Sequence, residues 1–102
     1  MTSPPVRMTS AAEIRRLFND GDFWARAQRG ELTEAVLTES HPSPPRASLP
    51  ACTRRQILAY FDPQGVKVAL VHQYLRPDGS LGASGRPDPK KLLLDGVLYI
   101  VG

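Results

Sequence analysis

The sequence predicts an α+β domain in which two N-terminal helices precede an antiparallel β-meander of three to four strands. Apolar residues recur at helical spacing in the first part of the chain and alternate with period two in the last part, with a proline-rich segment between them. Helices and strands that are segregated along the chain in this way are typical of the α+β class. We expect a flexible tail over residues 1–9 and a single α+β domain over 10–102, with helices over 10–39, a proline-rich connector over 40–50 and the sheet over 53–101.

Two short helices are expected in the first part of the domain. Ser10 can cap the first helix, and Glu13 stands three residues later, which is the spacing of a capping box. Asp22 can cap the second helix, which carries apolar residues up to Val36. The apolar stripe shifts across Gly30, so we expect a kink or break there.

The second part of the domain is expected to be the sheet. Four prolines in residues 40–50 exclude a helix and favour an extended connector. Farther on, Asp62-Pro63-Gln64-Gly65 has the composition of a β-turn, and Asp95-Gly96 suits a type I′ hairpin turn. The strand over 66–75 is apolar on both faces and is therefore expected at the centre of the sheet. Two short helices do not cover both faces, so either the connector or a second subunit is expected on the other face.

Cysteine usage and hydropathy limit the class of protein. Cys52 is the only cysteine, which excludes an intramolecular disulfide and a cysteine-based zinc site and indicates a reducing compartment. No segment approaches the run of about 18 apolar residues that a membrane span needs. The N-terminus also lacks the apolar run of a signal peptide. We therefore expect a cytoplasmic protein without a membrane partner.

The positive charge is concentrated in the second half of the chain. The net charge is +3, from 13 basic and 10 acidic side chains. Residues 1–50 hold six arginines and six acids, whereas residues 51–102 hold seven basic side chains and four acids. An excess of this sign favours an anionic partner.

A basic, glycine-rich loop over residues 76–91 is the candidate binding site. Its three glycines at every third position from 79 to 85 leave backbone amides open, and cationic side chains bracket them. We expect a non-enzymatic binding protein that presents this loop to an anionic partner, either nucleic acid or an acidic protein surface. The predicted partner-binding residues are Arg76, Gly82, Ser84, Gly85, Arg86, Lys90 and Lys91.

A catalytic alternative uses the same loop. Pro77-Asp78 and Asp88-Pro89-Lys90 follow the letters of the PD-(D/E)xK nuclease pattern, in which two acids hold Mg²⁺ and a lysine stabilises the reacting groups. Asp78 and Asp88 would then be metal ligands and Lys90 a catalytic residue of a divalent-metal nuclease or phosphodiesterase. Only nine residues separate the two aspartates, and proline disfavours a strand interior, so both features count against this alternative.

A third alternative is a structural subunit of a homo- or hetero-oligomer, in which a partner covers the open face of the sheet. The histidines do not favour a site of their own. His72 alternates with Leu70 and Tyr74 on an apolar face of the predicted strand and is expected in the core. His41 stands 31 positions away in the connector, which is no metal-ligand spacing.

The runs YLRPDGSLGASGRPDPK (residues 74–90) and DGVLYI (residues 95–100) resemble the C-terminal part of a family of small uncharacterised prokaryotic proteins. No activity is attached to that family, so the resemblance implies no catalytic residue and no cofactor. It favours the loop as a feature in its own right.

Overall fold

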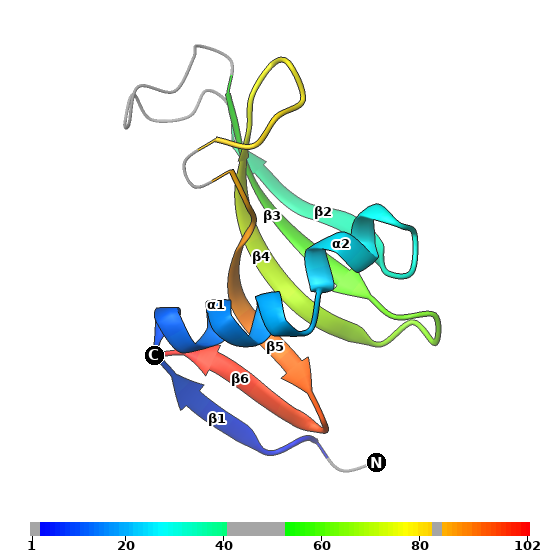
Figure 1. Cartoon of the computed structure of the whole chain (residues 1–102), viewed down its shortest axis with the longest axis vertical. Helices are drawn as coiled ribbons and strands as arrows, with labels where there is room; N and C mark the ends of the chain where they lie inside the picture. The colour runs from blue at the N-terminus through cyan, green and yellow to red at the C-terminus, as the bar shows by residue number, and fades with distance from the viewer. Residues whose placement is uncertain (1–2, 41–52, 83–84) are drawn as a thin grey trace.

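The described part of the chain, residues 3–40, 53–82 and 85–102 of a computed structural model, forms a six-stranded mixed sheet with two short helices on one face (Figure 1). The elements in chain order are β1 (Val6–Thr9), α1 (Ala11–Asp20), α2 (Phe23–Gln28), β2 (Thr33–Ser40), β3 (Arg54–Phe61), β4 (Lys67–Leu75), β5 (Asp88–Leu94) and β6 (Val97–Val101). Across the sheet the order is β1-β6-β5-β4-β3-β2. The β1–β6 pair is parallel and the other pairs are antiparallel.

The predicted order of two N-terminal helices and a meander of three to four strands is wrong, first because a strand precedes the helices. Residues 6–9, expected as part of a flexible tail, form β1 at the edge of the sheet, where Val6 lies opposite Leu98 and Thr9 opposite Val101. The Leu98 amide also donates to the Pro5 carbonyl at 2.9 Å. β1 is an edge strand of four residues with mostly exposed side chains, which is too short for a pattern of alternating apolar residues to be recognised. Its partner strand also lies at the other end of the chain.

The prediction is also wrong over residues 33–40, which form β2 instead of continuing the second helix. The helix ends at Gln28, and Gly30 follows with a φ of +84°, so the predicted break at this glycine is complete. The segment beyond it contains β-branched residues, which favour strands, and β3 offers it an antiparallel neighbour. The antiparallel meander therefore has five strands in the described residues, β2 to β6.

Local predictions about caps and turns are largely confirmed. The Ser10 hydroxyl accepts a hydrogen bond from the Glu13 amide at 3.1 Å. Asp95 and Gly96 both have positive φ angles, 51° and 77°, as a type I′ turn requires. Asp22 does occupy the N-cap position of α2, but its side chain accepts no cap hydrogen bond and lies 3.2 Å from Arg29.

The core lies between the two helices and the sheet face that they cover. Phe18 of α1 stacks on Phe23 of α2 with ring centroids 5.7 Å apart, and its ring lies 6.1 Å from that of Tyr60 on β3. All three side chains are buried. This packing fixes α1 against β5 and β6, so Arg15 and Asn19, one turn apart on α1, are held beside the start of β5.

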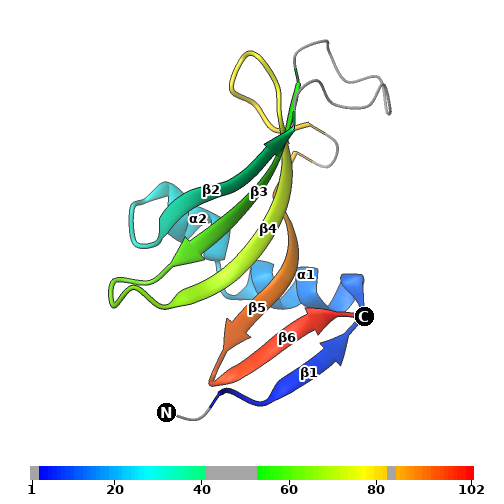
Figure 2. The same ribbon diagram turned by 180° about the vertical axis from the view of Figure 1, so that it is seen from behind.

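No helix of the described residues covers the opposite face of the sheet (Figure 2), where apolar side chains lie. The strand registers place Val6 and Leu98 side by side there, and Met8 beside Ile100. Val6 and Met8 are 58% and 61% exposed. The connector over 40–50 was expected to cover this face, but residues 41–50 lie outside the described residues.

Candidate functional site

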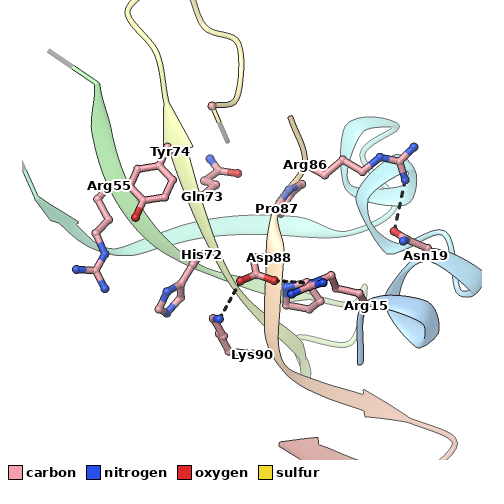
Figure 3. A pocket seen from close by; sticks show the side chains of 12 residues that line it. Arg15, Asn19, Arg55, His72, Gln73, Tyr74, Arg86, Pro87, Asp88 and Lys90 are labelled. Atoms are coloured by element: carbon pink, nitrogen blue, oxygen red, sulfur yellow. Dashed lines mark hydrogen bonds and ion pairs between the residues drawn. The ribbon is translucent and has the colours of Figure 1, made fainter. Parts of the chain in front are cut away.

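A cavity of about 520 Å³ lies where β5 separates from the end of β4 (Figure 3). Beside the end of β4, Leu81 pairs with Leu75, and the Gly82 amide donates to the Tyr74 carbonyl at 2.7 Å. The pairing of β5 with β4 ends at Asp88, opposite His72. Residues 85–87 lie outside the sheet, and the cavity opens at this gap. Its lining comes from α1, β3, β4, the loop before β5, and β5: Arg15, Asn19, Arg55, His72, Gln73, Tyr74, Gly82, Arg86, Pro87, Asp88, Pro89 and Lys90.

The cavity concentrates the positive charge of the chain. Among the described residues, four cationic side chains line it, Arg15, Arg55, Arg86 and Lys90, against the one carboxylate of Asp88, which gives a formal charge of +3. The whole chain also carries +3, from 13 basic and 10 acidic side chains. The other nine basic and nine acidic side chains of the sequence cancel, so the described lining of the cavity carries a formal charge equal to the net charge of the chain.

Lys90 lies at a β-bulge and pairs with Asp88. Pro89 lies opposite Val71 and Lys91 lies opposite Leu70, so Lys90 is an extra residue without a partner on β4. A bulge tolerates proline because the ladder there needs no amide donor. The Lys90 Nζ lies 2.8 Å from one carboxylate oxygen of Asp88, and the Arg15 Nε lies 3.3 Å from the other.

These contacts keep the Asp88 carboxyl ionised. Burial alone would raise its pKa, but the hydrogen bond and charge of Lys90, and then those of Arg15, outweigh burial and lower the pKa below its ordinary value. Asp88 thus joins α1 to β5 while it neutralises only part of the surrounding positive charge.

Arg55 is the cation of the cavity that is available for a ligand. It lies opposite Tyr74, and within the described residues it forms no ion pair. Its neighbour Arg54 faces the other side of the sheet, as successive strand residues do, and its guanidinium lies 3.6 Å from Glu39. The two adjacent arginines therefore differ in their surroundings, and Arg54 is a natural control for Arg55.

Arg86 connects the loop to the helices. Its guanidinium lies 5.9 Å from the centroid of the Trp24 ring and donates to the Asn19 side-chain oxygen at 3.5 Å (Figure 3). A guanidinium over an aromatic ring is stabilised by the charge distribution of the ring. The loop residue is thereby held on the helix side of the cavity.

A row of polar side chains crosses three strands and ends at the cavity. Glu39 on β2 accepts a hydrogen bond from Gln56 on β3 at 2.8 Å, and Gln56 accepts one from Gln73 on β4 at 2.8 Å. Gln56 is only 6% exposed. Because a buried amide needs partners, this row fixes the position of Gln73 at the wall of the cavity.

His72 lines the cavity and is not a buried core residue, contrary to the sequence-based expectation. Desolvation, followed by the positive charges of Lys90 and Arg55, lowers the pKa of His72 below its ordinary value, while the Asp88 carboxylate acts in the opposite direction. The imidazole is therefore neutral at pH 7.

The predicted partner-binding residues are distributed over several places. Gly82, Arg86 and Lys90 line the cavity. Arg76 and Gly85 are not part of its lining, and Lys91 lines a smaller cavity of about 150 Å³ next to Lys67. Ser84 lies outside the described residues. Sequence reasoning missed the members from α1, β3 and β4: Arg15, Asn19, Arg55, His72, Gln73 and Tyr74.

The residues of the nuclease alternative are only partly brought together. Asp88 and Lys90 form an ion pair in the cavity, but Asp78 is not among the lining residues. The Asp78 carboxylate accepts hydrogen bonds from the Ser80 hydroxyl at 2.6 Å and the Ser80 amide at 2.9 Å, which lower its pKa. Among the residues that the structure describes, no group of three or more His, Cys, Asp or Glu side chains could hold a metal ion.

No protein-family model matches the chain, and no curated protein or solved structure matches it. In the described ranges, no helix has the length and apolar character to cross a membrane.

Proposed function

We propose that the protein is a non-enzymatic nucleic-acid-binding protein whose cavity holds a phosphate group. The observation that carries this proposal is that Arg15, Arg55, Arg86 and Lys90, from three separate segments of the chain, line one cavity whose described residues include a single acid. Guanidinium and ammonium groups supply only hydrogen-bond donors and match the oxygens of a phosphate. Arg55 has no competing ion pair among the described residues, so it is free to bind the phosphate.

The concave shape favours a nucleic-acid phosphate over an acidic protein surface. The cavity, at about 520 Å³, is comparable to sites for small molecules, which span about 300–1,000 Å³. One nucleotide of a flexible strand fits a site of this size. An acidic protein surface carries its carboxylates on short side chains spread over a face, and these do not enter a cavity together.

Replacement of Arg55 tests the proposal. In fluorescence anisotropy with a labelled oligothymidylate of about 12 nucleotides, we expect salt-dependent binding, with a log–log slope near −0.7 per neutralised phosphate. Arg55→Ala should weaken binding about tenfold at low salt, because a charge-assisted hydrogen bond contributes about 1.5–3 kcal/mol. Arg54→Ala should have little effect, since Arg54 pairs with Glu39 outside the cavity. Equal losses in both variants, or binding that does not change with salt, would contradict phosphate binding in the cavity.

The protonation of His72 provides a second test. Its pKa lies below the ordinary value of about 6.5, so acidification adds a positive charge to the cavity and should tighten oligonucleotide binding below about pH 6.5. Burial, Lys90, Arg55 and Asp88 set this pKa, and Arg15 is a further charged residue that lines the cavity. A bound phosphate should raise the pKa of His72 in an NMR titration, and His72→Asn should remove the pH-dependent gain in affinity. If oligonucleotide affinity rises by the same factor on acidification in His72→Asn, another titrating group causes the gain.

The same pKa fixes the sign of the effect on stability. The folded state binds the His72 proton more weakly than the unfolded chain does. The contribution of His72 to stability is therefore fully present above about pH 6.5 and decreases as the pH falls through the unfolded and then the folded pKa. Urea unfolding without oligonucleotide should show this decrease, and His72→Asn should reduce it.

A further inference from the structure

Resting on the proposed function, we infer that Gln73 receives an unpaired base beside the bound phosphate, so that the ligand is a single strand. The inference combines the fixed orientation of the Gln73 amide with its position on the opposite side of β4 from Arg55.

The row that ends at Gln73 determines which way its amide points. A carboxylate accepts hydrogen bonds and does not donate them, so the Gln56 group next to Glu39 must be its NH₂. The Gln56 carbonyl oxygen then faces Gln73, which must present its own NH₂ to it. The carboxylate of Glu39 at the start of the row therefore determines the orientation of both amides.

Gln73 therefore keeps one N–H and its carbonyl oxygen for the cavity. In the described residues neither of these two groups has a hydrogen-bond partner, because the only bond that Gln73 forms with its side chain is the one to Gln56. An adjacent donor and acceptor match the edge of a nucleobase, which carries the complementary pair, as in the contacts of glutamine with adenine. If a phosphate alone occupied the cavity, either the remaining N–H or the carbonyl oxygen of Gln73 would form no hydrogen bond.

Gln73 lies on the opposite side of β4 from Arg55. Successive residues of a strand face opposite sides, so His72 and Tyr74 lie with Arg55 on one side of β4 and Gln73 lies on the other (Figure 3). Asn19, the ring of Pro87, and the side chains of Arg15 and Arg86 lie on the same side as Gln73. A nucleotide across the edge of β4 can thus place its phosphate near Arg55 and its base near Gln73.

The cavity also requires that the strand be unpaired. Its volume of about 520 Å³ accepts a nucleotide but not a duplex. A base that is not paired offers its hydrogen-bonding edges to a protein, which is how proteins read single strands. Base contacts then add specificity to the positioning that phosphate contacts provide.

Gln73→Met tests the inference because methionine keeps a similar size and removes both the donor and the acceptor. The wild-type protein is titrated with a labelled single strand, with an abasic strand of the same length and charge, and with the duplex form. We expect the base-containing strand to bind about tenfold more tightly than the abasic one, since each hydrogen bond contributes about 0.5–1.5 kcal/mol. In Gln73→Met the ratio should fall to about one, with unchanged affinity for the abasic strand, which also shows that the variant is folded. Gln64→Met, in the turn between β3 and β4, is the control and should keep the wild-type ratio.

The possible outcomes separate this inference from the proposed function. If no strand binds at low salt, the proposed function fails. If wild-type protein binds the abasic strand or the duplex as tightly as the single strand, phosphate binding stands and the inference about Gln73 fails. If Gln73→Met weakens binding of the abasic and base-containing strands equally, Gln73 has only a structural role and the inference also fails. Separate titrations with RNA and with DNA show which of the two the protein binds. Loss of base preference in Gln73→Met with either one supports the inference.

Discussion

Phe18→Ala is expected to lower the free energy of unfolding by about 3–5 kcal/mol, as the loss of a buried phenylalanine does in other cores. The ring is 2% exposed and contacts aromatic side chains of two other elements, Phe23 on α2 and Tyr60 on β3. A small domain has a total stability of about 5–15 kcal/mol, so the variant should be close to unfolding. Urea denaturation followed by circular dichroism measures the change.

Val36→Ala is the matched control for this experiment. Val36 lies on β2 and is 51% exposed, so its truncation should cost no more than about 0.5 kcal/mol. Equal effects of the two substitutions would contradict the placement of Phe18 in the core.

The core and the cavity depend on each other through α1. The residues of α1 that face the core, Ile14 and Phe18, alternate with Arg15 and Asn19, which reach the cavity. Loss of core packing should therefore weaken the ion pair between Arg15 and Asp88 as well. This coupling explains why a site assembled mainly from the second half of the chain includes residues of the first helix.

The parts of the fold that were predicted from the sequence depend on local interactions. The cap at Ser10 and the type I′ turn at Asp95-Gly96 involve residues within one or three positions of each other, and a short stretch of sequence is enough to recognise them. The two missed strands depend on distant partners. β1 pairs with β6 at the far end of the chain. β2 becomes a strand because β3, which follows it in the sequence only after residues 41–52, lies beside it.

The site was predicted only where its residues lie in the loop. Arg86 and Lys90 are prominent in a basic, glycine-rich segment, so composition alone indicates them. The position of Arg55 depends on which side of β3 it faces, and neither its charge nor its neighbour Arg54 reveals that. Gln73 is even less apparent, because its orientation follows from hydrogen bonds across three strands whose order is known only from the fold.

Asp88→Asn should strengthen anion binding about ten- to a hundredfold, which distinguishes the proposed function from the nuclease alternative. In the part of the chain that the structure describes, Asp88 is the only acid that lines the cavity, and it pairs with both Arg15 and Lys90. Removal of its charge leaves both cations available to a phosphate. An additional unit of positive charge at about 4 Å contributes about 1 kcal/mol in water and about 4 kcal/mol at an effective dielectric constant of 20.

The cost in stability should be small, because both ion pairs of Asp88 are partly exposed to solvent, and such pairs contribute about 0–1 kcal/mol. Asp78→Asn is the control, since Asp78 binds Ser80 in its own turn and should leave oligonucleotide affinity nearly unchanged. A metal-dependent nuclease would respond differently: both substitutions would remove metal ligands and abolish cleavage in the presence of Mg²⁺. Anisotropy titrations and a cleavage assay on the same variants measure both quantities. Weaker oligonucleotide binding by Asp88→Asn, in a protein that still unfolds cooperatively, would contradict the role of Asp88 as the carboxylate that limits the positive charge of the cavity.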